Sequence, residues 1–328
     1  MDKKEILVIN GGGPLEGEVT ISGAKNSALP ILAACVLGTE EIILDGVPGL
    51  KDVEIMIEVL RHLGSKVEYI SEDSVRIDSS NLNTCETPFE LMDKMRASFV
   101  VMGPLLSRFK EAYTKAPGGC NIGARPIDLH LKGFEALGAT NIVNDDEISI
   151  KTDGKLIGNE VYLDFPSVGA TQNIMMAATL AEGETIIENA AKEPEIVDLA
   201  SFLSKMGAKI KGAGTSTITI EGVEKLTGTR HTIIPDRIEA ASYMIAAAMT
   251  KGNVTINNVI GSHIRPVIAK LIEMGAEVDE IDDEDIIKVK VDKKLKPTNI
   301  QTLPYPGFPT DVQAQFMALM TICDGESK

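Results

Sequence analysis

The stretch Leu60-Arg-His-Leu-Gly64 ends an apolar helical pattern at a glycine and leads directly into alternating residues typical of strands. Glycine is the usual residue just past a helix, because it adopts a positive φ without strain. The same pattern recurs at residues 134–138, 203–207 and 271–275. The four glycines follow one another at intervals of 74, 69 and 68 residues. The chain is therefore predicted to repeat a structural unit of about 70 residues.

A second feature of the sequence, the predicted end of another helix, recurs with the same period of about 70 residues. Helices rich in small residues are predicted to end at Gly38, near Lys110, and at Gly183, Gly252 and Gly325. A strand, a loop, a second helix and a hairpin follow; the first hairpin is expected at residues 66–70 and 74–77. Each unit is thus predicted to have the order βαβαββ. Several such units around a shared helical core make an α/β domain.

The fifth unit begins near Thr310, and the chain ends three residues after Gly325. About four and a half units are therefore expected in the chain. We interpret the sequence as a C-terminally truncated form, with a shorter natural variant that binds a partner chain as the alternative. At roughly 150 residues per domain, 328 residues indicate two domains.

The composition excludes several classes of protein. Acidic residues outnumber basic ones, 48 to 32, and the net charge of −16 argues against a nucleic-acid-binding surface. It does not exclude a small anionic ligand, which a few basic side chains in one cleft can hold. No apolar run approaches the ~18 residues of a membrane span, and no signal peptide is recognisable. Four scattered cysteines favour neither a zinc site nor a disulfide scaffold, so we expect a cytoplasmic protein without a bound metal.

Polar residues recur where the first helix of each unit is predicted to begin. Helix N-termini favour phosphates and carboxylates, because their N–H groups are unsatisfied and carry partial positive charge. We therefore expect an anion-binding cleft between the two domains. The alternative is that the acidic residues only cap helices and the basic ones are solvated. The residues at these helix starts are Lys25-Asn26, Arg96, Gly169-Ala170-Thr171, Asp236-Arg237 and Asp311.

The loop at residues 116–126 is the second unusual segment, with three glycines around Cys120. Loops of this composition often carry function. Pro126 is predicted at the first helical position, which places Arg125 at the helix cap. A cysteine beside an arginine has the environment of a reactive acid or nucleophile, and an unreactive surface thiol is the alternative.

The remaining motifs in the sequence do not indicate a binding or catalytic function. Residues 11–17 lack the GxGxxG pattern, so a dinucleotide-binding fold is not favoured. The acidic run at residues 279–285 is interpreted as a solvated hairpin turn. The four histidines are scattered, and His130 is predicted to be structural within a helix.

Together, several segments closely resemble the UDP-N-acetylglucosamine 1-carboxyvinyltransferases, which with the EPSP synthases form the enolpyruvyl transferase family. The clearest are Ser22-Gly-Ala-Lys-Asn26, Pro117-Gly-Gly-Cys120 and Phe308-Pro-Thr-Asp311. The resemblance covers essentially the whole chain. It implies a two-domain, inside-out α/β barrel of six βαβαββ units. It also implies that the first strand joins the later units, so that residues 1–22 plus 235–328 form one domain and residues 23–234 the other.

The resemblance implies transfer of the enolpyruvyl group of phosphoenolpyruvate to the 3-hydroxyl of UDP-N-acetylglucosamine, with release of phosphate. This reaction belongs to peptidoglycan synthesis in the bacterial cytoplasm and uses no metal or organic cofactor. Neither nucleic acid nor membrane insertion is implied, and no particular oligomeric state is predicted. One alternative is an EPSP synthase-like transferase with another acceptor, against which the cysteine loop argues. Another is a non-catalytic ligand-binding paralogue.

The resemblance also assigns roles. Cys120 matches the residue that donates a proton to the methylene group of phosphoenolpyruvate. Asp311 matches a candidate base at the sugar hydroxyl, and Lys25 matches a cation that contacts phosphoenolpyruvate. Substrate-binding positions are matched by Lys25, Asn26, Arg96, Arg125, Pro126, Ile127, Asp128, Leu129, Ser167, Val168, Gly169 and Asp311. Phe165 and Pro166 depart from the lysine that some members place near the uracil. Because the last unit and a half is not in the chain, we expect it to bind substrates poorly.

Overall fold

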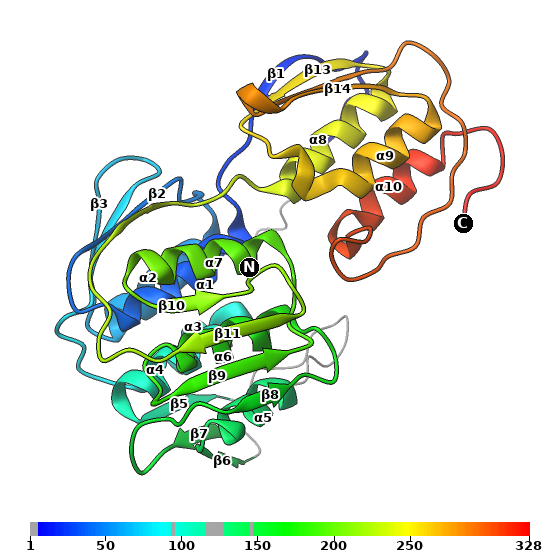
Figure 1. Cartoon of the computed structure of the whole chain (residues 1–328). Helices are drawn as coiled ribbons and strands as arrows, with labels where there is room; N and C mark the ends of the chain where they lie inside the picture. Colours follow the sequence, from blue (N-terminus) through cyan, green and yellow to red (C-terminus); the bar gives the residue numbers. More distant parts are fainter. Residues whose placement is uncertain (1–5, 93–95, 116–126, 145–146) are drawn as a thin grey trace. The chain divides into compact units, whose positions relative to one another are not determined.

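The computed structural model describes residues 6–92, 96–115, 127–144 and 147–328 (Figure 1). Cys120, Arg125 and Pro126 lie outside the described residues. The chain divides into two compact units, and each is described by itself. The larger unit is Ser22–Asp236 with Pro304–Pro306. The smaller unit holds the chain up to Ile21, Arg237–Leu303 and Gly307–Lys328.

The first repeat of the larger unit confirms the predicted hairpin. Its sheet has the order β12-β2-β4-β3, in which β12 is parallel to β2 and the other neighbours are antiparallel. A late strand of the unit therefore completes the sheet of the first repeat. The elements are α1 (Lys25–Ala34), η1 (Cys35–Leu37), β2 (Ile42–Asp45), α2 (Lys51–His62), β3 (Lys66–Tyr69), β4 (Val75–Asp78) and β12 (Arg230–Thr232).

The second repeat has a three-stranded sheet, β5-β7-β6. Its second helix, α5, begins at Asp128 with Ile127 as the cap. The prediction that Pro126 occupies the first helical position is therefore wrong, because the helical hydrogen bonds start later in the chain. The elements are α3 (Phe89–Met92), η2 (Arg96–Val101), α4 (Met102–Phe109), β5 (Glu111–Lys115), α5 (Asp128–Ala136), β6 (Thr140–Val143) and β7 (Glu147–Lys151).

The third repeat has the sheet order β10-β11-β9-β8, with β8 parallel to β9. This is the arrangement of the first repeat, although here all four strands are contributed by consecutive elements. Its elements are β8 (Glu160–Tyr162), α6 (Val168–Ala178), β9 (Glu184–Glu188), α7 (Pro194–Lys205), β10 (Lys209–Lys211) and β11 (Thr217–Glu221).

The smaller unit repeats this arrangement as β1-β13-β15-β14, and β1 is parallel to β13, as the resemblance implied. The acidic run at residues 279–285 covers the end of β14 and the turn from β14 into β15, so the prediction of a hairpin turn is confirmed for residues 282–285. The elements are β1 (Glu16–Thr20), α8 (Arg237–Thr250), β13 (Asn253–Asn257), η3 (Gly261–Ile264), α9 (Arg265–Met274), β14 (Glu277–Ile281), η4 (Asp282–Glu284), β15 (Ile286–Lys290), η5 (Thr310–Val312) and α10 (Gln313–Met320).

The four glycines that revealed the repeat all follow helices and all have positive φ. The values are 104°, 90°, 109° and 103° at Gly64, Gly138, Gly207 and Gly275. Left-handed backbone is strained for residues with a Cβ, which is why glycine recurs there. The sequence period therefore reports a real structural period.

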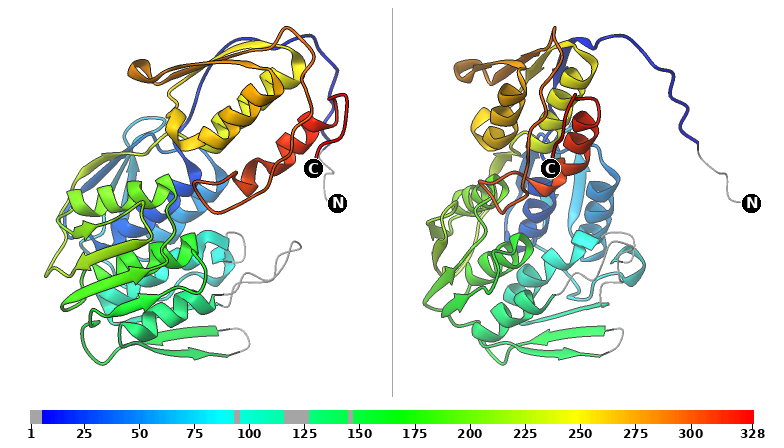
Figure 2. Two further views of the ribbon diagram at one scale, coloured as in Figure 1. Left: turned by 45° about the vertical axis from the view of Figure 1, so that its right-hand side comes forward. Right: turned by 90° about the vertical axis from the view of Figure 1, so that its right-hand side faces the viewer.

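Helices form the centre of the larger unit. In α1 every residue from Ser27 to Ala34 is buried, and in α6 every residue from Ala170 to Ala178 is buried. Helices buried on all sides carry small and apolar residues all round, unlike the amphipathic α2. α4 packs against α6, η2 packs against α1 and α6, and the sheets lie outside them (Figure 2). The chain has an α/β fold in which α1 and α6, the first helices of the first and third repeats, are internal to the larger unit.

Candidate functional site

The beginning of α1 is fixed by a short backbone pairing with residues 234–236. The Ala24 N–H donates to the Ile234 carbonyl at 2.8 Å, and the Asp236 N–H donates to the Ser22 carbonyl at 2.9 Å. The carboxylate of Asp236 accepts from the Lys25 N–H at 3.2 Å. The first helical residue, Lys25, is therefore held by segments that are distant in sequence.

Gly23 precedes this helix at a point where a side chain does not fit. A Cβ on Gly23 would lie 1.8 Å from the carbonyl oxygen of Gly46. No rotation of a side chain relieves a contact with backbone. The glycine before the lysine therefore permits the close approach of two loops at the start of α1.

The ammonium of Lys25 lies 3.4 Å from the carboxylate of Asp52, near the start of α2. Both side chains are accessible, with exposed fractions of 43% and 40%. Ion pairs at this exposure contribute little, typically about 0–1 kcal/mol. An incoming anion can therefore replace Asp52 as the partner of Lys25 at low cost.

Helix α6 begins at a second predicted position. The hydroxyl of Ser167 caps the helix by accepting from the Ala170 N–H at 3.3 Å, and the Ser167 carbonyl accepts from the Thr171 hydroxyl at 2.8 Å. The next residues, Val168 and Gly169, form the first turn. The N–H groups of a first helical turn lack intrahelical acceptors, which suits them to bind an anion.

A buried amide, Asn173, joins three of the predicted segments. Its Oδ1 accepts from the Gly103 N–H at 2.7 Å, and its Nδ2 donates to the Phe99 carbonyl at 2.9 Å. The same Nδ2 lies 2.9 Å from Nδ1 of His130 in α5. Asn173 therefore ties η2 and α4 to α5 and to its own helix, α6.

These contacts assign the protonation of His130. Because Oδ1 of Asn173 accepts a hydrogen bond, the amide orientation is fixed and Nδ2 donates to Nδ1 of His130. The neutral ring then carries its proton on Nε2. Burial lowers the pKa of His130 to about 4, opposed by the nearby carboxylate of Asp128. A Cβ on Gly169 would lie 3.1 Å from Cε1 of this ring, so the imidazole sits against the start of α6.

We expect His130 to make the stability of the protein depend on pH. The ordinary pKa of histidine is 6.5, so between pH 6.5 and 4 the unfolded chain binds a proton that the folded chain does not. The free energy of unfolding should therefore fall as the pH is lowered through this range, by up to about 3 kcal/mol from this residue. Urea unfolding at pH 6.5 and 4.5, compared between the wild type and His130→Gln, measures this contribution.

The matched control is His62→Gln, which replaces an exposed histidine of α2 and should keep the wild-type dependence on pH. An equal loss of stability on acidification in His130→Gln and in the wild type would contradict the assignment.

The structure brings several predicted residues of the larger unit onto neighbouring elements. Arg96 is the first residue of η2, Ile127 caps α5, and Asp128 and Leu129 are its first residues. η2 packs against α1 and α6, and α6 packs against α5. The starts of α5 and α6 are adjacent, since His130 contacts the position of Gly169.

Asp311 lies in the smaller unit, in the short helix η5, and is exposed. The Gln315 side chain donates from Nε2 to the Asp311 carbonyl at 3.0 Å. The neighbouring Val312 and Phe308 are buried and anchor the segment in the core of this unit. The carboxylate is thus held at the surface on a fixed backbone.

Sequence reasoning missed Asn173 and Asp52. The only signal for Asn173 in the sequence is an amide among the apolar residues of α6, and its burial and hydrogen bonds are seen only in the structure. Nothing in the sequence indicates that Lys25 forms an ion pair with Asp52.

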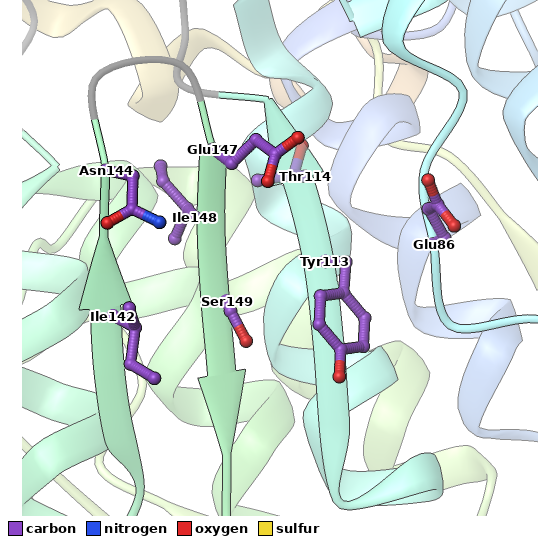
Figure 3. Close-up of a pocket in the computed structure, with 8 residues that line it drawn as sticks. All are labelled: Glu86, Tyr113, Thr114, Ile142, Asn144, Glu147, Ile148 and Ser149. Carbon is purple, nitrogen blue, oxygen red and sulfur yellow. The ribbon is translucent and has the colours of Figure 1, made fainter.

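A hollow of about 240 Å³ lies on the sheet of the second repeat (Figure 3). None of the predicted substrate-binding residues lines it. Its carboxylates, Glu86 and Glu147, disfavour anionic substrates, so we do not assign the candidate site to it. The lining residues are Glu86, Tyr113, Thr114, Ile142, Asn144, Glu147, Ile148 and Ser149.

The described residues include neither a candidate metal cluster nor a candidate membrane span. Among them, no group of three or more His, Cys, Asp and Glu side chains is arranged to hold a metal ion. In the same part of the chain, every helix is too short or too polar to cross a bilayer.

A family model described as EPSP synthase (3-phosphoshikimate 1-carboxyvinyltransferase) matches residues 9–328. The chain belongs to this family. The internal helices and repeated sheets described above are therefore the fold of the EPSP synthase family.

Relatives within the family are similar over nearly the whole chain. The UDP-N-acetylglucosamine 1-carboxyvinyltransferase of Finegoldia magna is 66% identical over 323 residues, which are 98% of this chain and 76% of that protein. An enzyme of the same name from Carboxydothermus hydrogenoformans, numbered 2, is 58% identical over 98% of this chain and 77% of its own length. That of Caldanaerobacter subterraneus, numbered 1, is 55% identical over 99% and 77%.

Solved structures of the family share the fold. The enolpyruvyl transferase NikO of Streptomyces tendae superposes with a TM-score of 0.86 and 22% identity, covering 97% of this chain and 75% of that one. EPSP synthase of Acinetobacter baumannii gives a TM-score of 0.71 with 21% identity, covering 94% and 71%. At these identities the likeness concerns the fold alone.

Proposed function

We propose that this protein transfers the enolpyruvyl group of phosphoenolpyruvate to the 3-hydroxyl of UDP-N-acetylglucosamine and releases phosphate, a step of peptidoglycan synthesis. The observation that carries the proposal is the 55–66% identity to relatives named UDP-N-acetylglucosamine 1-carboxyvinyltransferase. Both substrates are small anions of the cytoplasm, so we place the enzyme there.

On the phosphoenolpyruvate side, Lys25 and Arg125 neutralise the phosphate and the carboxylate, and Asn26 contacts the reacting groups. The exposed Lys25 ammonium and its weak pairing with Asp52 support this role. Protonation of the double bond makes C2 cationic, while the phosphate and the carboxylate stay anionic, and it is these two groups that the fixed cations hold throughout the reaction.

The chemical step needs one acid and one base. Cys120 donates a proton to the methylene carbon, and the sugar 3-hydroxyl bonds to C2 while Asp311 accepts its proton. Elimination then breaks the bond from C2 to the phosphate oxygen, and a proton leaves the methyl group to restore the double bond. Asp311 suits this role because its carboxylate is exposed on an anchored backbone.

On the nucleotide side, the ligand contacts Arg96 and the starts of α5 and α6. The residues involved are Arg125, Pro126, Ile127, Asp128, Leu129, Ser167, Val168 and Gly169. The packing of α5 on α6 and of α6 on η2 supports a single site for these segments. We further propose that residues 1–22 with 235–328, and 23–234, are the two domains of the enzyme.

Phosphate release from phosphoenolpyruvate tests this function. With the protein as it is made in the cell, release should require UDP-N-acetylglucosamine and yield one enolpyruvylated nucleotide sugar per phosphate, measured by mass spectrometry. Release that instead requires shikimate 3-phosphate would establish the EPSP synthase reaction, which the family model also describes. Tight binding of the nucleotide sugar without any release would indicate a non-catalytic paralogue.

A further inference from the structure

A buried polar cluster lies directly beneath the first turn of α1. It consists of Ser27 in α1, Asp198 in α7 and His231 in β12, and the exposed Lys205 of α7 lies at its edge. The side chains of Asp198 and His231 are only 4% and 3% exposed, and Ser27 is fully buried. The proposed reaction uses none of the four residues.

The carboxylate of Asp198 accepts hydrogen bonds from three elements. The Ser27 hydroxyl and the Ile234 N–H donate to Oδ2, the latter at 3.3 Å. The imidazole of His231 donates from Nε2 to Oδ1 at 2.8 Å. A buried carboxylate is stable only when such donors replace its water.

The partners of His231 fix its tautomer. The Lys205 ammonium lies 3.0 Å from Nδ1, and an ammonium can only donate, so Nδ1 accepts. The proton of the neutral ring is then on Nε2, where it meets Asp198. Each polar group of the cluster therefore has a partner of the correct kind.

The order of the groups excludes a serine nucleophile. In a hydrolytic triad the histidine stands between the serine and the acid, and accepts the serine proton. Here the carboxylate stands between serine and histidine, and both donate to it. The cluster therefore holds Ser27 in place and does not activate it.

What the carboxylate holds is the segment that carries Lys25 and Asn26. Ser27 is one residue beyond Asn26, and the Ile234 carbonyl accepts from the Ala24 N–H at 2.8 Å. Asp198 thus binds α1 on one side of Lys25 and binds the backbone that pairs with Ala24 on the other side. Both anchors of this turn converge on one carboxylate.

We propose that Asp198 is a positioning residue that sets Lys25 and Asn26 for phosphoenolpyruvate, with Ser27 and Ile234 as its contacts and His231 and Lys205 as its support. This inference rests on the proposed function. A misplacement of about 1 Å at reacting groups can reduce a rate by about 100-fold, so the loss of one anchor should be measurable.

Ser27→Ala tests the proposal, because it removes one anchor at little change in volume. The KM for phosphoenolpyruvate should rise about tenfold, while the KM for UDP-N-acetylglucosamine stays within about twofold. Ser74→Ala is the matched control, since Ser74 is also buried and donates to an aspartate, Asp45, at 2.7 Å in the same unit. It should leave both KM values unchanged.

Amide hydrogen exchange provides a readout that does not depend on the reaction. The peptide covering residues 23–28 should exchange faster in Ser27→Ala than in the wild type, and at the wild-type rate in Ser74→Ala. Unchanged exchange there would overturn the positioning role even in an active enzyme. If this peptide exchanges faster in Ser27→Ala but the wild-type protein releases no phosphate, the proposed function is refuted and the positioning role is not.

His231→Phe is a second variant that keeps an aromatic ring against Phe202 and removes the donor to Asp198. It should raise the KM for phosphoenolpyruvate in the same selective way. If Ser27→Ala and His231→Phe raise the KM values for phosphoenolpyruvate and UDP-N-acetylglucosamine equally, or raise neither, the proposal is overturned.

Discussion

Replacing Asp311 by asparagine is expected to lower kcat for enolpyruvyl transfer by about 1,000-fold, within the range that general acid–base groups contribute. Asparagine keeps the shape of the side chain but cannot accept the proton of the sugar hydroxyl. The backbone should stay in place, because Gln315 binds the carbonyl of residue 311 and Val312 is buried beside it. The KM values should therefore change by less than about threefold.

Steady-state kinetics with both substrates varied measures this effect. The control is Asp324→Asn, which removes an exposed carboxylate of the same unit that pairs with Lys294. That variant should retain the wild-type kcat. A kcat within about tenfold of the wild type in Asp311→Asn would assign the base to another group.

Lys25→Met should lower kcat/KM for phosphoenolpyruvate by about 100-fold or more. The change removes a charge that stabilises the phosphate and the carboxylate in the ground state and in the transition state. Methionine has nearly the same length and suits a helix, so α1 should remain folded. Binding of UDP-N-acetylglucosamine, measured by calorimetry without phosphoenolpyruvate, should be affected by less than about threefold.

Lys51→Met is the matched control, because Lys51 is an exposed lysine at the first position of the neighbouring helix α2. It lies next to Asp52 but does not pair with it in the structure, and it should leave kcat/KM unchanged. If both variants lose activity equally, the effect belongs to the general charge of this surface and the assignment of Lys25 is wrong.

The repeat was predictable because its signals are local. A glycine past a helix needs only its own backbone conformation, and the alternation of Val75 and Ile77 in β4 needs only one buried face. Such signals gave the period, the hairpins and the predicted starts of α1 and η2. Helix α5 begins two residues after the predicted position, because a proline is compatible with the first helical position without requiring it.

The candidate site was predictable only in part. Lys25, Arg96, Asp128 and Ser167 stand at or near helix starts, and polar residues at predicted helix starts are visible in the sequence. The residues that hold these side chains and helix starts in place are not visible in the sequence in this way. Asp52 meets Lys25 from another helix, and its position in the sequence indicates only a helix start.

The sequence by itself determined the repeated α/β unit, the helix starts that carry polar residues, and the family. The tertiary structure alone decided which residues hold those helix starts. Asn173 contacts groups at positions 99, 103 and 130, and Asp198 contacts residues 27, 231 and 234. A buried polar group must find partners wherever the fold places them, so its role depends on contacts between segments far apart in the chain.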